Sequence, residues 1–95
     1  MKHASSVKQR RKEAGLWLKE LRERAGLTQM DLAARLDLKY YAFISQVETG
    51  FTRLPPQKLE AWANAVGAEP SLFARRLLAF YEPELHRVLY EDKPN

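Results

Sequence analysis

The chain has 95 residues, 45% of them hydrophobic, and a formal net charge of +4 at pH 7. This length favours one domain with a small core. There is no cysteine, which excludes disulfides and thiolate metal sites, and His3 and His86 stand far apart in the sequence, so no metal or other cofactor is expected. No apolar run approaches the about 18 residues of a membrane span, and the basic N-terminus lacks the apolar stretch of a signal peptide, so we expect a cytoplasmic protein without a membrane partner.

The net positive charge lies near the N-terminus. Residues 1–13 carry an excess of +4, because the only acidic residue among them is Glu13, and the rest of the chain is neutral. We expect residues 1–12 to form a flexible arm whose basic side chains include Lys8, Arg10, Arg11 and Lys12. A local basic excess suits the neutralisation of phosphates, although basic tails also serve solubility alone.

The first three predicted elements are helices. The first ends at about Arg24 and starts either near Ser6 or near Glu13, since Gly15 leaves both starts open. Its apolar positions repeat at three and four residues: Ala14, Trp17, Leu18 and Leu21. Thr28 is a good N-cap for a second helix at 29–36, residues 37–39 form a turn, and a third helix runs from about 40 to 48.

Three further helices are predicted at about 56–66, 70–81 and 84–90. Prolines open or interrupt these segments, and no stretch alternates with period two for long enough to form a sheet. We therefore predict an all-α fold class. A compact five-helix domain at 13–82 contains a helix-turn-helix, and a short extra helix and tail follow at 83–95.

The third helix has two unlike faces. At about 100° per residue, one face is apolar and the other is small, polar and uncharged, whereas an ordinary solvated face carries charges. Base edges in the major groove of DNA require short hydrogen-bonding side chains, and Gln46 can bond an adenine edge with both atoms of its amide. We expect base contacts from Tyr41, Ala42, Ser45, Gln46 and Thr49. The alternative is an ordinary amphipathic helix of the core.

Several short motifs carry a family resemblance. Leu-Thr-Gln at 27–29, Leu-Ala at 32–33 and Ile-Ser-Gln-Val-Glu-Thr-Gly at 44–50 resemble the phage-repressor helix-turn-helix family (lambda cI and Cro, also called XRE). The resemblance covers about residues 16–73. It implies a repressor-like five-helix DNA-binding domain of bacterial or phage origin. Such a domain binds a pseudo-palindromic operator in double-stranded DNA as a homodimer and most often represses transcription.

The resemblance also assigns roles to individual residues. Gln29 matches the residue that holds a phosphate and braces the recognition helix, and Arg22 and Glu48 match an ion pair between the first and third helices. The segment between Leu38 and Ile44 is one residue longer than is usual in the family, which leaves the base contacts of the two tyrosines open. Asp37 stands where the family has a glycine in the turn, and aspartate tolerates left-handed geometry less well than glycine.

Two further surfaces are predicted. Phosphate contacts are expected from Gln29, Lys39, Tyr40, Thr52, Arg53 and Lys58, each of which is otherwise an ordinary surface residue. The C-terminal segment is more apolar than a small core requires, so we expect a dimer interface, the alternative being a last helix that folds back in a monomer. The expected interface residues are Leu72, Phe73, Arg76, Leu77, Phe80, Tyr81, Leu85 and Leu89.

The chain does not resemble an enzyme. It has no nucleophile–base constellation and no glycine-rich phosphate loop. A protein-interaction module on the same fold, such as an antitoxin-like or adaptor partner of another protein, is the second hypothesis. RNA is the less suitable nucleic acid, because the major groove of its A-form is too narrow for a helix.

Overall fold

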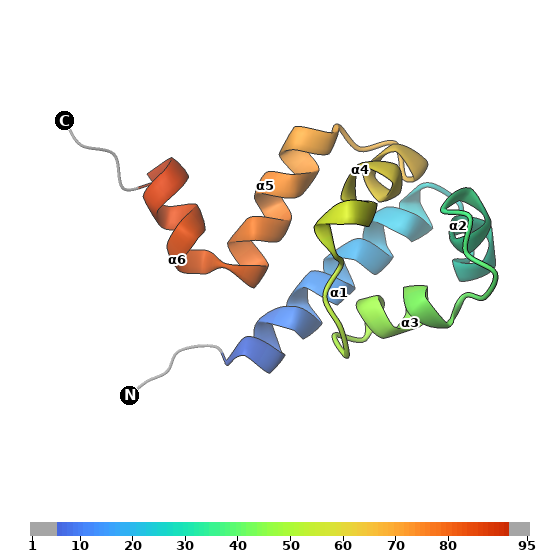
Figure 1. Cartoon of the computed structure of the whole chain (residues 1–95), viewed down its shortest axis with the longest axis horizontal. Coiled ribbons are helices and arrows are strands. Elements are labelled where there is room, and N and C mark those ends of the chain that lie inside the picture. The colour runs from blue at the N-terminus through green and yellow to red at the C-terminus, as the bar shows by residue number, and fades with distance from the viewer. Residues whose placement is uncertain (1–5, 92–95) are drawn as a thin grey trace.

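The computed structural model describes residues 6–91, and all regular elements in this range are helical. In chain order they are α1 (Val7–Arg24), α2 (Gln29–Arg35), α3 (Ala42–Glu48), α4 (Pro56–Ala65), α5 (Pro70–Tyr81) and α6 (Pro83–His86), followed by a π-helical turn at Arg87–Glu91 (Figure 1). The predicted all-α fold with a helix-turn-helix and a short C-terminal helix is confirmed.

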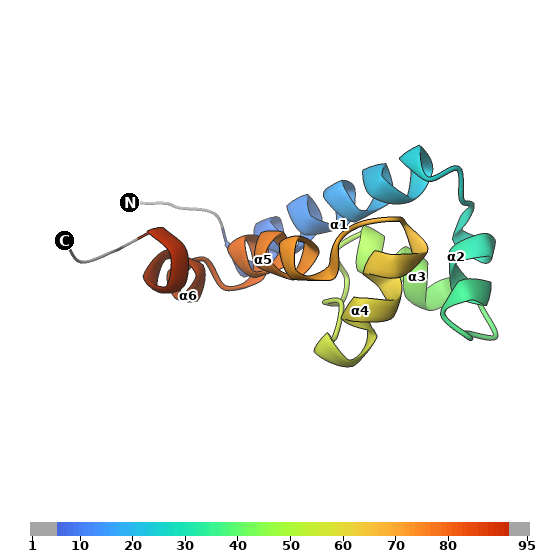
Figure 2. The same ribbon diagram turned by 90° about the horizontal axis from the view of Figure 1, so that it is seen from above.

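Helix α1 is the longest element and organises the others. It packs against α5 and α3, while α2 and α4 pack against each other at its far end (Figures 1 and 2). The core between these helices is apolar, and its largest fully buried side chains are Trp62, Phe73, Leu18, Leu32, Ile44 and Val47. Helix α6 packs on α5 and on the π-helical turn that follows it, and projects from the rest of the molecule (Figure 2).

Local side chains explain where α1, α2 and α5 begin. The Ser6 hydroxyl accepts a hydrogen bond from the Gln9 amide at 3.0 Å, which satisfies a free N–H in the first turn of α1. Thr28 and Asp31 form a reciprocal capping box at the start of α2, with bonds of 3.0 and 2.8 Å. At the start of α5 the Glu69 carboxylate accepts hydrogen bonds from the amides of Ser71 and Leu72, at 3.3 and 3.1 Å.

Two predicted boundaries are corrected. Helix α1 begins at Val7, so residues 7–12 are its first turns and not a flexible arm, while residues 1–5 lie outside the described range. Helix α3 begins at Ala42, two residues later than predicted, and has no side-chain cap. The turn before it is therefore longer, and both tyrosines of that segment lie outside the helix.

The expected dimer interface is corrected in part. Phe73 and Leu77 are each only 2% exposed and belong to the core of the single chain. Phe80 and Tyr81 are half-buried against the same core. These four residues face inward because α5 turns one side toward α1 and α4. Leu72 and Leu85 remain exposed, as do Leu89 and Arg76.

Candidate nucleic-acid interface

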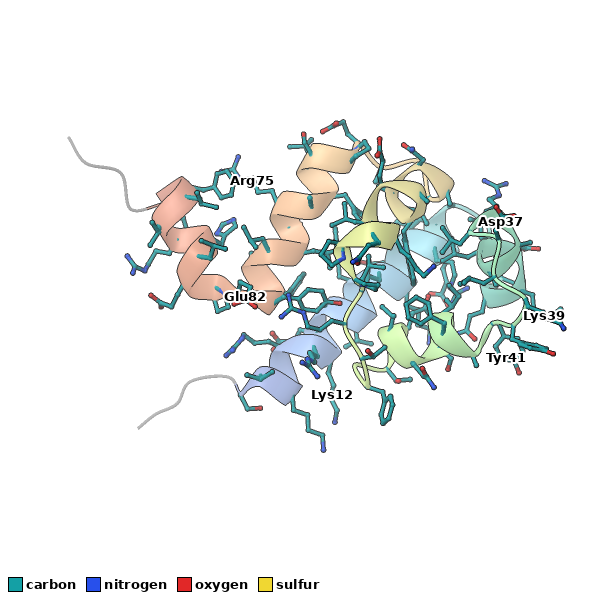
Figure 3. The ribbon with its side chains drawn as sticks, in the orientation of Figure 1. Lys12, Asp37, Lys39, Tyr41, Arg75 and Glu82 are labelled. Atoms are coloured by element: carbon teal, nitrogen blue, oxygen red, sulfur yellow. The ribbon has the colours of Figure 1, made fainter. Side chains whose placement is uncertain are left out.

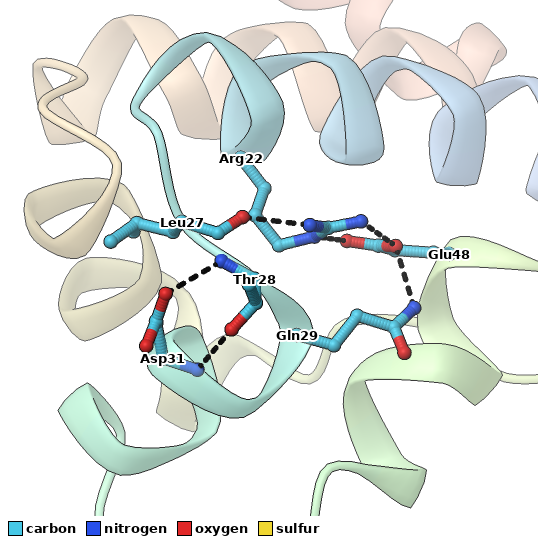
Figure 4. A network of polar contacts seen from close by, with 6 residues as sticks. All are labelled: Arg22, Leu27, Thr28, Gln29, Asp31 and Glu48. Atoms are coloured by element: carbon cyan, nitrogen blue, oxygen red, sulfur yellow. Dashed lines mark hydrogen bonds and ion pairs between the residues drawn. The ribbon is translucent and has the colours of Figure 1, made fainter.

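A buried polar network fixes α3 against α1 and α2 (Figure 4). Arg22 Nε donates to Glu48 Oε2 at 2.6 Å, and Arg22 Nη2 donates to Glu48 Oε1 at 3.0 Å. Arg22 Nη1 donates to the carbonyl oxygen of Leu27 at 2.8 Å, and Gln29 Nε2 donates to Glu48 Oε1 at 3.0 Å. The hydrogen bond from Arg22 to Glu48 raises the pKa of this arginine. The Glu48 carboxylate of α3 thus accepts hydrogen bonds both from Arg22 of α1 and from Gln29 at the start of α2.

Two glycines let the backbones of α1 and α3 meet directly. A Cβ added at Gly15 would lie 2.1 Å from the carbonyl oxygen of Glu48, and one added at Gly50 would lie 2.8 Å from Lys12 Cα. No side chain fits at either point, because real Cβ atoms essentially never approach other atoms within 3.0 Å. The first half of α1 therefore lies along the C-terminal end of α3.

The outer face of α3 is small and uncharged. Ala42, Gln46 and Thr49 are exposed and Ser45 is half-buried, whereas Ile44 and Val47 on the opposite face are fully buried. The Thr49 hydroxyl donates to the carbonyl oxygen of Gln46 at 3.3 Å. The side chain of Gln46 has no such partner among the described residues. Its amide can present a donor and an acceptor to a base edge.

The turn before α3 exposes aromatic side chains. Asp37 adopts a left-handed φ of 56°, and the amide of Leu38 donates to the carbonyl oxygen of Ala33 at 2.8 Å. Tyr40 is 69% and Tyr41 51% exposed. Figure 3 shows Tyr41 and Lys39 together at the start of α3, at the end opposite Lys12. Lys39 Nζ lies 5.5 Å from the Tyr40 ring centroid.

The loop after α3 and the first turn of α4 hold the other predicted phosphate ligands, and most of them have partners within the chain. Arg53 Nη1 donates to Glu82 at 2.8 Å, and the Arg53 guanidinium stacks 4.6 Å from the Tyr81 ring centroid. Lys58 Nζ lies 5.9 Å from the Phe43 ring centroid. Thr52 is half-buried. Arg53 thus braces the loop against the end of α5, which the sequence did not indicate.

The basic residues of the first turns of α1 face in different directions. Arg11 lies near Tyr81: burial raises the pKa of that phenol, and the hydrogen bond from the Leu54 amide and the positive charges of Arg53 and Arg11 partly oppose this. Lys12 instead lines a hollow with Lys19, Thr49 and Gln29. Lys19 was not among the predicted site residues, because its place beside α3 follows only from the start of α1 and the crossing of α1 with α3.

The described residues hold no group of three or more histidine or acidic side chains placed to bind a metal ion. Within the same range, no helix is long and apolar enough to cross a bilayer. The family model for the helix-turn-helix domain matches residues 13–76. The chain belongs to the helix-turn-helix domain family. No protein with a curated description matches the chain.

In this helix-turn-helix domain, α2 and α3 are the two helices of the motif. The motif generally places its second helix in the major groove of DNA while the first crosses the backbone. The structure brings Gln29 at the start of α2 together with Glu48 and Thr49 at the C-terminal end of α3, and adds Lys12 and Lys19 at their flank. Arg53 is instead paired with Glu82 at the C-terminal end of α5.

Proposed function

We propose that this helix-turn-helix domain is a sequence-specific DNA-binding regulator of the phage-repressor (XRE) type. The observation that supports this most is the outer face of α3, where Ala42, Gln46 and Thr49 are exposed and carry no charge. Such a face allows close approach to base edges and offers hydrogen bonds without electrostatic repulsion from the phosphates. A merely solvated helix face would gain nothing from the absence of charge.

In this proposal α3 reads bases and its surroundings hold the backbone. Gln46 donates to and accepts from an adenine edge, Ser45 and Thr49 reach neighbouring bases, and Ala42 and Tyr41 contact a thymine methyl near the start of the helix. Backbone contacts come from Gln29, Lys39 and Tyr40. Arg53 contributes less, because its guanidinium is already paired with Glu82. Lys58 stays available, because like Lys39 it has only an aromatic ring beside its ammonium group.

Binding as a homodimer is part of the same proposal. Leu72, Leu85, Val88 and Leu89 are between 49% and 65% exposed and lie on α5, α6 and the following π-helical turn. Exposed apolar surface of this kind favours burial against a second copy, with Arg76 at its rim. A two-fold dimer places two copies of α3 about one DNA turn apart, which suits a pseudo-palindromic operator and repression by occupancy.

Paired substitutions on α3 test this function. Replacing Ser45 and Gln46 by alanine is expected to abolish the preference for the selected operator over random duplex, without loss of thermal stability or of self-association. Asn64→Ala is the matched control, because it removes an amide from an exposed position of α4. Retention of the full preference by the α3 variant in a competition binding assay would contradict the proposal.

A second function rests on the exposed C-terminal apolar surface. The residues that we assign to dimerisation also suit a different protein partner, as in an antitoxin-like or adaptor module. Sedimentation equilibrium separates the two. A monomer at high micromolar concentration that binds no specific duplex would favour the interaction module over the dimeric regulator.

A further inference from the structure

Three lysines of α1 form a stripe beside α3. At about 100° per residue, Lys8, Lys12 and Lys19 fall within an arc of about 40° on the helix surface. Gly15, whose missing Cβ admits the carbonyl of Glu48, lies on the same side. The lysine stripe, defined as Lys8, Lys12 and Lys19, therefore runs along the flank of α1 that adjoins the recognition helix.

The stripe has no electrostatic partner in the described part of the chain. All three lysines are exposed, and none has a hydrogen bond, ion pair or ring contact with a described residue. The arginines of the second half of α1 differ, because Arg22 pairs with Glu48 and Arg24 pairs with Glu20. Exposed like charges on a helix repel each other only modestly in water, but three ammonium groups on one line create a local positive potential that attracts an anion of matching length.

The position of the stripe fits the wall of a DNA groove. The close approach of Gly15 to the Glu48 carbonyl holds the first half of α1 beside the C-terminal end of α3. The major groove is about 12 Å wide, so a helix at its centre has phosphates about 6 Å away on either side. Lys12 and Lys19 line one hollow with Thr49, the residue that follows α3. With α3 in the groove, the long side chains of these two lysines can therefore reach the phosphates on that side of it.

We propose that the lysine stripe is a preformed binding site for the sugar–phosphate backbone of duplex DNA, alongside the groove that α3 occupies. This inference rests on the proposed DNA-binding function and adds a backbone-binding site to it. The site needs no flexible arm, because helix α1 holds the three lysines in place. Arg10 and Arg11, which occupy the same turns, are half-buried and take no part, since Arg11 lies against Tyr81.

Neighbouring basic residues provide a matched experiment. The double variants Lys8→Gln/Lys12→Gln and Arg10→Gln/Arg11→Gln each remove two charges from the same turns of α1. The logarithm of the DNA affinity is measured against the logarithm of salt concentration with one duplex. Each phosphate contact contributes about 0.9 to the magnitude of this slope, so the slope of the lysine variant should be shallower by about 1.8 and that of the arginine variant almost unchanged. The affinity defect of the lysine variant is then about 12-fold larger at 50 mM than at 200 mM salt.

A second pair of variants covers the other end of the stripe. Lys19→Gln should reduce the slope by about 0.9, whereas Arg24→Gln, on the same helix but paired with Glu20, should leave it unchanged. Thermal melts check that each variant is folded. Two results would overturn the proposed role of the lysine stripe while leaving the proposed function intact. The first is an equal loss of salt slope in the lysine and arginine variants. The second is an unchanged salt slope in the lysine variants that still prefer the operator. Failure of the unmodified chain to bind any duplex would overturn the proposed function as well.

Discussion

Replacing Gly15 by alanine should destabilise the protein, although the same change usually stabilises a helix. Alanine is favoured over glycine by about 1 kcal/mol in the interior of a helix. At position 15, however, the new Cβ would lie 2.1 Å from the carbonyl oxygen of Glu48 and 2.8 Å from that of Val47. Both atoms belong to the backbone and cannot rotate away, so the Gly15 Cβ position and the Glu48 carbonyl oxygen must move apart by about 1.3 Å to reach an ordinary contact of 3.4 Å.

The expected magnitude follows from these opposing effects. Overpacking a core costs about 1–3 kcal/mol, and the rigid backbone contact places Gly15→Ala at the upper end of that range. After the gain in helix propensity, a net loss of about 1–2 kcal/mol in the free energy of unfolding remains. For a domain of this size the melting temperature should fall by about 4–8 °C for each kcal/mol.

Urea denaturation of two variants gives the test. Ala61→Gly is the control, because Ala61 is exposed in the interior of α4 and reports the intrinsic preference, an expected loss of about 1 kcal/mol. The account predicts that glycine is the better residue at position 15 and the poorer one at position 61. A Gly15→Ala protein as stable as the parent, or more so, would refute the close contact of α1 and α3.

Three further predictions concern single side chains. Glu48→Ala should lower the free energy of unfolding by about 3–5 kcal/mol in urea denaturation, because it leaves the buried guanidinium of Arg22 unpaired. Replacing both residues by apolar ones should restore much of this loss. Equal losses in the single and double variants would count against the buried pair. Hydrogen bonds from the Thr28 backbone and side chain lower the pKa of Asp31 below 3.8, so its contribution to stability is complete above that pH and is lost as the pH falls through the lower folded value. The stability difference between the parent and Asp31→Asn should therefore shrink below about pH 4, and a difference independent of pH would contradict the capping role. At position 37, where φ is 56°, glycine should be more stable than alanine by about 1 kcal/mol in thermal melts, and the opposite order would argue against the left-handed turn.

The sequence predicted those elements best whose ends are marked by local chemistry. Helix α5 was predicted at 70–81 and runs over the same residues, because Pro70 fits the first helical position and Pro83 cannot continue the helix. Helix α3 begins later than predicted because no side chain caps it, so tertiary contacts decide its start. Apolar periodicity alone continues through Tyr40 and cannot show this.

The parts of the site that depend on contacts between distant segments were not predicted. From the sequence, Gly15 only leaves the start of the first helix open, whereas in the structure it is the point where α1 crosses α3. Phe73 and Leu77 were counted with the exposed surplus, although their spacing of four places both on the one buried face of α5. Lys19 aligns with Lys8 and Lys12 only if α1 starts at Val7, a choice that composition left open.

The central claim is that α3 reads a DNA sequence, and selection of bound duplexes from a random pool tests it most directly. The selection is made with the unmodified chain at physiological salt, in the presence of competitor DNA. The account predicts enrichment of an inverted repeat whose half-sites are about 10 bp apart, which is one helical turn. Salt-sensitive retention of duplexes with no enriched sequence would contradict it, since binding would then come from the backbone contacts alone.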